Sequence, residues 1–71
     1  MKITYSIYVV TDSFGNKDAT VVNESSDSIQ LCGLKNHLGE ALYFECEAYH
    51  LTKWCHDNDL EVKVYNVVKE V

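Results

Sequence analysis

Segments near both ends of the chain alternate between apolar and polar positions, with the period of two that a β-strand requires. In residues 2–11 the alternating side chains are β-branched or aromatic, which favours extended backbone. They are Ile3, Tyr5, Ile7 and Val9. In residues 60–71 the apolar side begins at Leu60 and continues to Val68, and Asn66 interrupts it, as at a bulge. The pattern therefore predicts a strand at each end of the chain.

A turn and a second extended segment follow the first strand. Residues 12–17 contain Gly15 and Asn16, two residue types that tolerate a positive φ. Residues 19–22 are Ala-Thr-Val-Val and resume the extended character. The start of the chain therefore predicts a β-hairpin.

A polar break at residues 23–28 separates this hairpin from the middle of the chain. Asp27 and Gln30 have the spacing of an acidic helix capping box. The apolar residues that follow fit a short helix, which we prefer, but Ile29 and Leu31 also alternate as in a strand. Residues 28–34 are therefore predicted as a short helix or a third strand.

Residues 36–58 follow a helical period. Their apolar side chains fall within roughly half of the circumference of a helix at about 100° per residue. The set, which begins just before this range, is Leu34, Leu38, Ala41, Leu42, Phe44, Ala48, Tyr49, Leu51 and Cys55. Glu45 falls within the same apolar arc. The pattern predicts one long amphipathic helix with a break near residues 36–39.

Together these elements predict a single two-layer α+β domain over residues 1–71. A right-handed helical crossover would place the last strand beside the first, giving a small antiparallel sheet of order 2-1-3. The long helix would cover the sheet face of Ile3, Tyr5, Ile7, Val9, Val62 and Val64. The other face would stay open and carry Thr4, Tyr8, Val10, Tyr65 and Val67, with either Val21 or Val22.

Two surfaces of this predicted fold are candidate contact sites for another protein. One is the open sheet face with Tyr8 and Tyr65, because Tyr is frequent at interface hot spots. The other is a stripe along the polar side of the helix, made of Tyr43, Glu47, His50, Trp54 and Asp57. Trp54 would anchor this stripe, unless the helix is rotated or residues 23–36 fold over the ring and bury it.

The charge distribution limits the classes of partner. The net charge is −5, and the six basic residues are all Lys and scattered along the chain. Because Arg forks and a basic patch are missing, we expect no direct binding to nucleic acid. No apolar run approaches the length of about 18 residues that a membrane span needs. The acidic surplus instead suits a larger protein partner with a basic surface.

The cysteines and histidines give little chemistry. The odd cysteine count and the lack of a signal peptide predict reduced thiols in a cytoplasmic protein. Cys46 and His50 have the spacing of two ligands on one helical face, which is too few for a firm metal site. No nucleophile and base are placed together by any motif. The sequence therefore predicts no enzyme activity, no cofactor and no bound metal.

The size, acidity and architecture are similar to those of many short phage- or plasmid-encoded proteins that block a host enzyme or a defence complex. We therefore predict a small, acidic, non-enzymatic protein-binding module. Its most concrete form is an anti-CRISPR or other counter-defence inhibitor that occludes a bacterial nucleic-acid machine sterically and electrostatically. The alternatives are a homo-oligomeric accessory protein, such as a homodimer, and a small metal-dependent regulator that uses Cys46 and His50.

Overall fold

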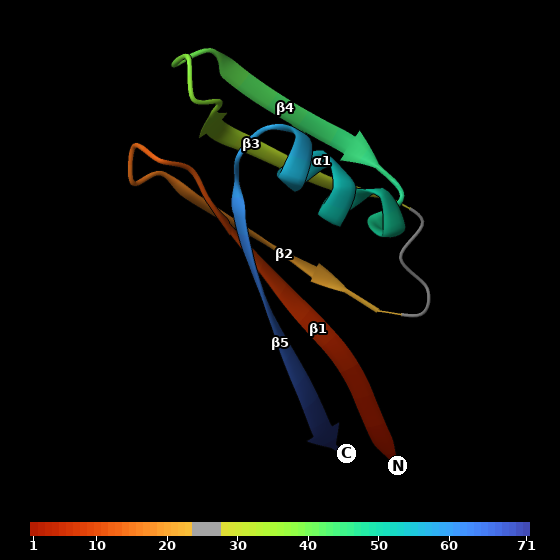
Figure 1. Ribbon diagram of the computed structural model, residues 1–71. Coiled ribbons are helices and arrows are strands. Elements are labelled where there is room, and N and C mark those ends of the chain that lie inside the picture. The colour runs from red at the N-terminus through yellow and green to blue at the C-terminus, as the bar shows by residue number, and fades with distance from the viewer. Residues whose placement is uncertain (24–27) are drawn as a thin grey trace.

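The computed structural model describes residues 1–23 and 28–71 (Figure 1). Most of these residues lie in strands, and one short helical segment interrupts them. The strands are β1 (Lys2–Thr11), β2 (Lys17–Val22), β3 (Ile29–Lys35), β4 (Ala41–Cys46) and β5 (Glu61–Glu70). The helical segment consists of the 3-10 turn η1 (Ala48–His50) and the helix α1 (Leu51–Asp57). The predicted cap Asp27 lies outside the described residues.

The hairpin and the last strand form a three-stranded antiparallel sheet of order β2-β1-β5. The central strand β1 sets the register, because Ile7 lies opposite Val21 in β2 and opposite Tyr65 in β5. The two terminal strands and their order in the sheet are therefore as predicted. No bulge occurs at Asn66, whose side-chain oxygen accepts a hydrogen bond from the Ser6 hydroxyl at 2.9 Å.

Beyond the end of β2 the sheet continues as a ribbon of two strands only. In Figure 1 the ends of β1 and β5 extend away from the rest of the molecule, and the two termini lie side by side. The Met1 amino group donates a hydrogen bond to the Val71 carbonyl at 3.1 Å. The molecule is correspondingly elongated, with a long axis of 46 Å.

The α+β fold class predicted from the sequence is wrong. Residues 36–58 do not form a long helix, because β4 and the turn before it occupy the first part of this range. The helix α1 has only seven residues, and η1 before it has three. Residues 29–35 are the strand β3, so the less preferred alternative for that segment is the one observed. The described chain is mostly β, with two antiparallel sheets, β2-β1-β5 and β3-β4.

The predicted helix break at residues 36–39 is a complete reversal of the chain. The Asn36 side-chain oxygen accepts hydrogen bonds from the backbone N–H groups of Leu38 and Glu40, each at 3.0 Å. Gly39 has a φ of 81°, a left-handed conformation that costs glycine little. Asn and Gly therefore build a hairpin turn between β3 and β4, and Leu38 is left 70% exposed at its tip.

A bulge in β3 explains why the apolar spacing imitates a helix. The pairing of β3 with β4 shifts register between Leu31 and Leu34, and Gly33 in that interval has a φ of 76°. The extra residue turns Leu34 to the same side as Ile29 and Leu31, so that all three side chains are buried. A spacing of three residues on a bulged strand thus has the period of a helical face.

The core lies at one end of the molecule, where α1 packs against the β3–β4 hairpin and the turn end of the other sheet. Its buried residues are Val10, Ile29, Leu31, Leu34, Phe44, Leu51, Cys55 and Leu60. Since β2 and β3 lie side by side, the two sheets enclose this core together (Figure 1). No described element covers the far end of the β1–β5 ribbon in the same way.

Asp12 links the two hairpins near this core. Its carboxylate, in a residue only 6% exposed, accepts hydrogen bonds from the backbone N–H groups of Phe14, Asn16 and Lys35, and one from the Asn16 side chain. Burial works against the charged form, but these four bonds outweigh it and lower the pKa of Asp12. The first turn is therefore fastened to the end of β3.

Candidate protein-contact surface

The helical stripe predicted as a contact site is dispersed in the structure. Tyr43 lies in β4, Glu47 precedes η1, and His50 ends η1, whereas only Trp54 and Asp57 lie in α1. Because these residues belong to different elements, helical spacing does not bring them onto one line. The five residues therefore do not form the predicted surface.

Trp54 is half-buried and packs against the core. Its ring lies against Phe44 of β4, with the ring centroids 5.0 Å apart and the planes tilted by 49°. The Asn58 side chain donates a hydrogen bond to the Trp54 carbonyl at 2.9 Å and closes the end of α1. The alternative of a buried Trp54 is therefore the better one, although Phe44, rather than the segment 23–36, provides the described ring contact.

Polar members of the stripe make local contacts on the surface. Tyr43 donates a hydrogen bond to Glu45 and accepts one from Gln30 across the hairpin. The bond to Glu45 is the main reason that the pKa of Tyr43 is raised. Glu45 is exposed, so its predicted place in the apolar arc is wrong. Asp57 binds Lys53 at 2.8 Å, one helical turn earlier.

Tyr8 and Tyr65, the other predicted contact residues, lie on opposite faces of the sheet. The register places Tyr8 opposite Val64, and Tyr65 opposite Ile7. Side chains directly opposite in an antiparallel pair share a face, and neighbours along a strand alternate. Tyr8 consequently packs against the core, whereas Tyr65 is 52% exposed on the outer side.

The outer side of the three-stranded sheet is covered by none of the described elements, and we call it the open face. Its apolar residues are Ile3, Tyr5, Ile7, Val9, Val21, Tyr65 and Val67. Ile3 and Val21 are 45% and 54% exposed. The sequence assigned Ile3, Tyr5, Ile7 and Val9 to the face beneath the helix. That assignment is wrong, because α1 packs on the side of Tyr8 and Val62.

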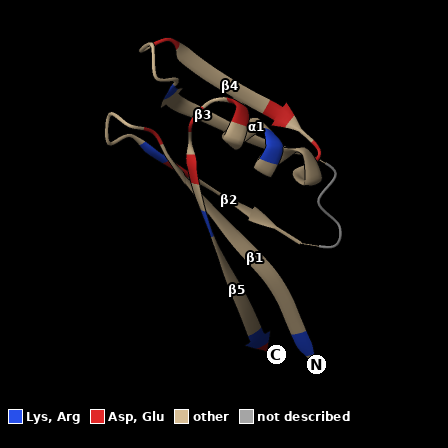
Figure 2. Ribbon diagram, in the orientation of Figure 1, with Lys and Arg blue, Asp and Glu red and all other residues tan. Residues whose placement is uncertain are grey.

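Three lysines lie at the margins of the open face. Lys17, Lys63 and Lys69 share the register side of its apolar residues, and Glu61 is the acidic residue among them. Most of the other acidic residues in the described part of the chain lie around the β3–β4 hairpin and α1 (Figure 2). An acidic chain thus presents an apolar sheet face with a largely cationic margin.

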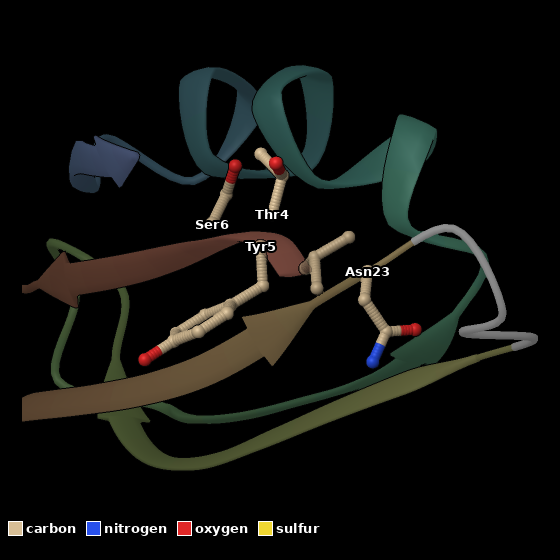
Figure 3. A pocket seen from close by; sticks show the side chains of 5 residues that line it. Thr4, Tyr5, Ser6 and Asn23 are labelled. Carbon is tan, nitrogen blue, oxygen red and sulfur yellow. The ribbon is translucent and has the colours of Figure 1, made fainter. Parts of the chain in front are cut away.

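A shallow pocket of about 320 Å³ lies where β2 ends beside β1 (Figure 3). It is lined by Thr4, Tyr5, Ser6, Val22 and Asn23. Figure 3 shows Thr4 and Ser6 on one side of β1 and Tyr5 on the other. Tyr5 is the one ionisable side chain in this lining, so the pocket offers no acid and base pair for catalysis.

The cysteines show no sign of a metal or catalytic site in the described part of the chain. Cys46 lies in β4 and His50 in η1, so they do not share a helical face. Burial raises the pKa of Cys55 to about 11, which keeps this thiol protonated at neutral pH. Among residues 1–23 and 28–71, no group of three or more His, Cys, Asp and Glu side chains could hold a metal ion.

No helix in the described residues is long and apolar enough to cross a membrane.

No known protein family, curated protein or solved structure was found to match the chain. The sequence contained one signal for the open face, since the two terminal strands have apolar residues on both of their sides. It did not show which side the rest of the chain would cover.

Proposed function

We propose that the chain is a non-enzymatic protein-binding module that docks through its open face. The observation that carries this proposal is the uncovered row of apolar side chains across β2, β1 and β5, with Val21 and Tyr65 more than half exposed. Apolar areas of this kind on a small protein mark contact sites for other proteins. Tyr65 and Tyr5 add the aromatic groups that commonly anchor such contacts.

The charges around this face indicate the kind of partner. Lys17, Lys63 and Lys69 would lie at the rim of the contact, where water still reaches the charges. A complementary partner surface is apolar at its centre and acidic at its edge. Lysine–carboxylate pairs at a rim chiefly accelerate association, so the association rate should fall as salt concentration rises.

An inhibitor of a bacterial nucleic-acid machine remains one form of this proposal. In that form a second, basic region of the partner would meet the acidic residues along β4, Glu40, Glu45 and Glu47 (Figure 2). The open face would supply the apolar contact.

The test compares two exposed tyrosines on different surfaces. Tyr65 of the open face and Tyr43 of the β3–β4 hairpin are 52% and 55% exposed, so Tyr65→Ala and Tyr43→Ala are matched variants. A partner would first be isolated with the tagged wild-type chain and then purified, and its affinity for each variant measured by calorimetry. We expect Tyr65→Ala to weaken binding by about 2 kcal/mol, as at a hot spot, and Tyr43→Ala to leave it unchanged.

A third variant tests the open face on a strand other than that of Tyr65. Val21→Glu introduces a charge into the open face on β2, away from β5. It should weaken partner binding as strongly as Tyr65→Ala while the circular dichroism spectrum stays that of the wild type. Binding that survives both open-face variants and is lost with Tyr43→Ala would move the site to the hairpin and refute the proposal.

A further inference from the structure

The outer edge of β5 is a long strand edge that no second strand and no bulge protects among the described residues. β5 has ten residues, and of the described elements only β1 pairs with it. Proteins commonly protect such edges with charged side chains, proline, bulges or covering segments, because the free backbone groups pair readily with another strand. The charged residues of β5 are of both signs, so they repel a second strand only in some registers. The chain has no proline, and the β1–β5 pairing runs without a register shift.

The hydrogen bonds at the termini show which backbone groups face outward. Met1 and Val71 exchange both of their backbone hydrogen bonds, at 2.9 and 3.1 Å. Such pairs alternate along an antiparallel ladder, so the odd-numbered residues of β5 direct their N–H and C=O groups toward β1. The even-numbered residues therefore direct theirs to the free edge. They are Val62, Val64, Asn66, Val68 and Glu70.

We propose that this edge pairs with β5 of a second copy of the chain, antiparallel and around a two-fold axis at Tyr65. Such an axis stands perpendicular to the sheet and keeps each side chain on its own face. With Tyr65 opposite Tyr65 of the second copy, Glu61 lies opposite Lys69 of that copy. The reciprocal pair forms at the other end of the two strands, so both ends are joined by opposite charges.

The remaining pairs in this register place no like charges opposite each other. Val62 lies opposite Val68 of the second copy, and Val64 opposite its Asn66. These are even-numbered residues, so their outward backbone groups form about eight hydrogen bonds between the copies. Lys63 lies opposite Val67, which leaves its ammonium group free at the surface.

Shifting the register by two residues removes this complementarity. One shift places Lys63 opposite Lys69, and like charges directly opposite are destabilising. The other shift pairs Glu61 with Val67 and confines the overlap to residues 61–67. The charge pattern of the strand therefore selects the axis at Tyr65.

The outer edge of β4 is the competing site, and it is less suited to self-pairing. β4 has six residues, compared with ten in β5. Glu40 and Glu47 flank it and Glu45 lies within it, so two copies would bring several carboxylates together. The edge of β5 is longer and carries both signs of charge.

Pairing at β5 would join the three-stranded sheets of the two copies into one sheet of six strands. The axis keeps both open faces on the same side, so the apolar area doubles and the two Tyr65 side chains meet at its centre. The pairing uses backbone edges and not the open face, so it does not rest on the proposed function. A partner could bind a monomer or a dimer.

The experiment is sedimentation velocity of the whole chain across a dilution series, with charge-swapped variants. The wild type has a mass of 8.1 kDa and should pass reversibly from monomer to dimer as concentration rises. Lys69→Glu places two glutamates opposite each other at both ends and should weaken the dimer about tenfold. Glu61→Lys combined with Lys69→Glu restores opposite charges and should restore the wild-type dissociation constant.

Val21→Glu serves as the control on the open face, and it should leave the dimer constant unchanged. A chain that stays monomeric at every concentration overturns the inference. So does a dimer that Lys69→Glu leaves intact, or one that the double variant fails to restore. A dimer lost only with Val21→Glu would place self-association on the open face, which would overturn the edge pairing.

A disulfide across the axis tests the register directly. In the proposed pairing the two residues 65 form a non-hydrogen-bonded pair, with Cα atoms about 4.5 Å apart and within disulfide reach. Tyr65→Cys, in a chain with Cys32→Ser and Cys46→Ala, should form a disulfide-linked dimer on mild oxidation. Lys63→Cys in the same chain should not. Equal cross-linking of the two variants would contradict this register.

Discussion

At the scale of single residues, burial is determined by the neighbours of a side chain. Trp54 was predicted on the polar side of a helix, yet it packs on Phe44, which is only ten positions earlier but lies in a strand. Tyr8 and Tyr65 were predicted on one face, yet the register separates them. The residue types indicated which side chains make contacts. Where those side chains lie depends on strand pairing between residues that are far apart in the sequence.

Asp12 is the residue whose ionisation matters most for the connection between the hairpins. Its folded pKa lies below the ordinary value of 3.8, so its contribution to stability is complete well above 3.8 and is lost as the pH falls from 3.8 through the lower pKa of the folded state. We expect the Tm to fall as the pH is lowered below about 5, and to fall less in Asp12→Asn. Thermal unfolding followed by circular dichroism at several pH values measures this.

The comparison variant for Asp12 is Asp57→Asn. Asp57 is an exposed partner of Lys53, and its pKa is lowered mainly by that hydrogen bond. A surface pair of this kind contributes little to stability. Asp57→Asn should therefore keep the wild-type pH profile, while Asp12→Asn also lowers the Tm at neutral pH. Identical profiles for the two variants would show that Asp12 is not the important carboxylate.

At the scale of elements, the bulge in β3 is the feature that separates the observed fold from the predicted one. Gly33 sits in the left-handed region and allows Leu31 and Leu34 to face the core together. Asn36 and Gly39 then form a hairpin turn where a mere helix break was predicted. The strand β4 alternates cleanly, with Leu42, Phe44 and Cys46 on the inner side. That alternation was present in the sequence and was obscured by the helical spacing around it.

Substitution of Gly33 tests the role of the bulge. Nothing lies within 4 Å of a Cβ built at this position, so Gly33→Ala meets no steric obstacle. The expected cost is conformational, about 1 kcal/mol for a left-handed alanine, which lowers the Tm by about 4–8 °C. Gly33→Asn should cost less, because Asn enters this region more readily. Equal stability of Gly33→Ala and the wild type in urea unfolding would mean that the bulge does not need this conformation.

At the scale of the whole molecule, the core at one end leaves the β1–β5 ribbon exposed at the other. The ribbon carries apolar residues on both of its sides. On the side of Tyr8, opposite the open face, Val64 and Val68 are 47% and 61% exposed. A small chain gains stability when such area is buried against a partner or a second copy. The elongated shape, the open face and the free β5 edge therefore all point toward association.

Amide hydrogen exchange measures whether the free edge of β5 pairs with a second copy of the chain. In the monomer, N–H groups of Val62, Val64 and Asn66 face solvent and should exchange rapidly, while those of Val67 and Tyr65 are held by β1. At concentrations where dimer forms, the even-numbered amides should become protected. Exchange rates that alternate along β5 at low concentration and stay the same at high concentration would argue against edge pairing.

The sequence by itself determined the local features of this protein. Period-two alternation fixed the two terminal strands, and Gly15 with Asn16 fixed the first turn, because these preferences depend on neighbouring residues. From composition and charge we predicted a protein partner and neither nucleic acid nor a membrane, and this stays a prediction.

Only the tertiary structure decided which face of the sheet is covered and which is open. The helical spacing of residues 34–55 arises from a bulge, a hairpin turn and a short helix placed in series, and the same apolar residues satisfy either arrangement. The choice depends on long-range packing of Leu31, Phe44 and Leu51 against Val10, residues far apart in the chain. A sequence window records which residues are apolar, but the burial of a face is a property of the whole assembled core.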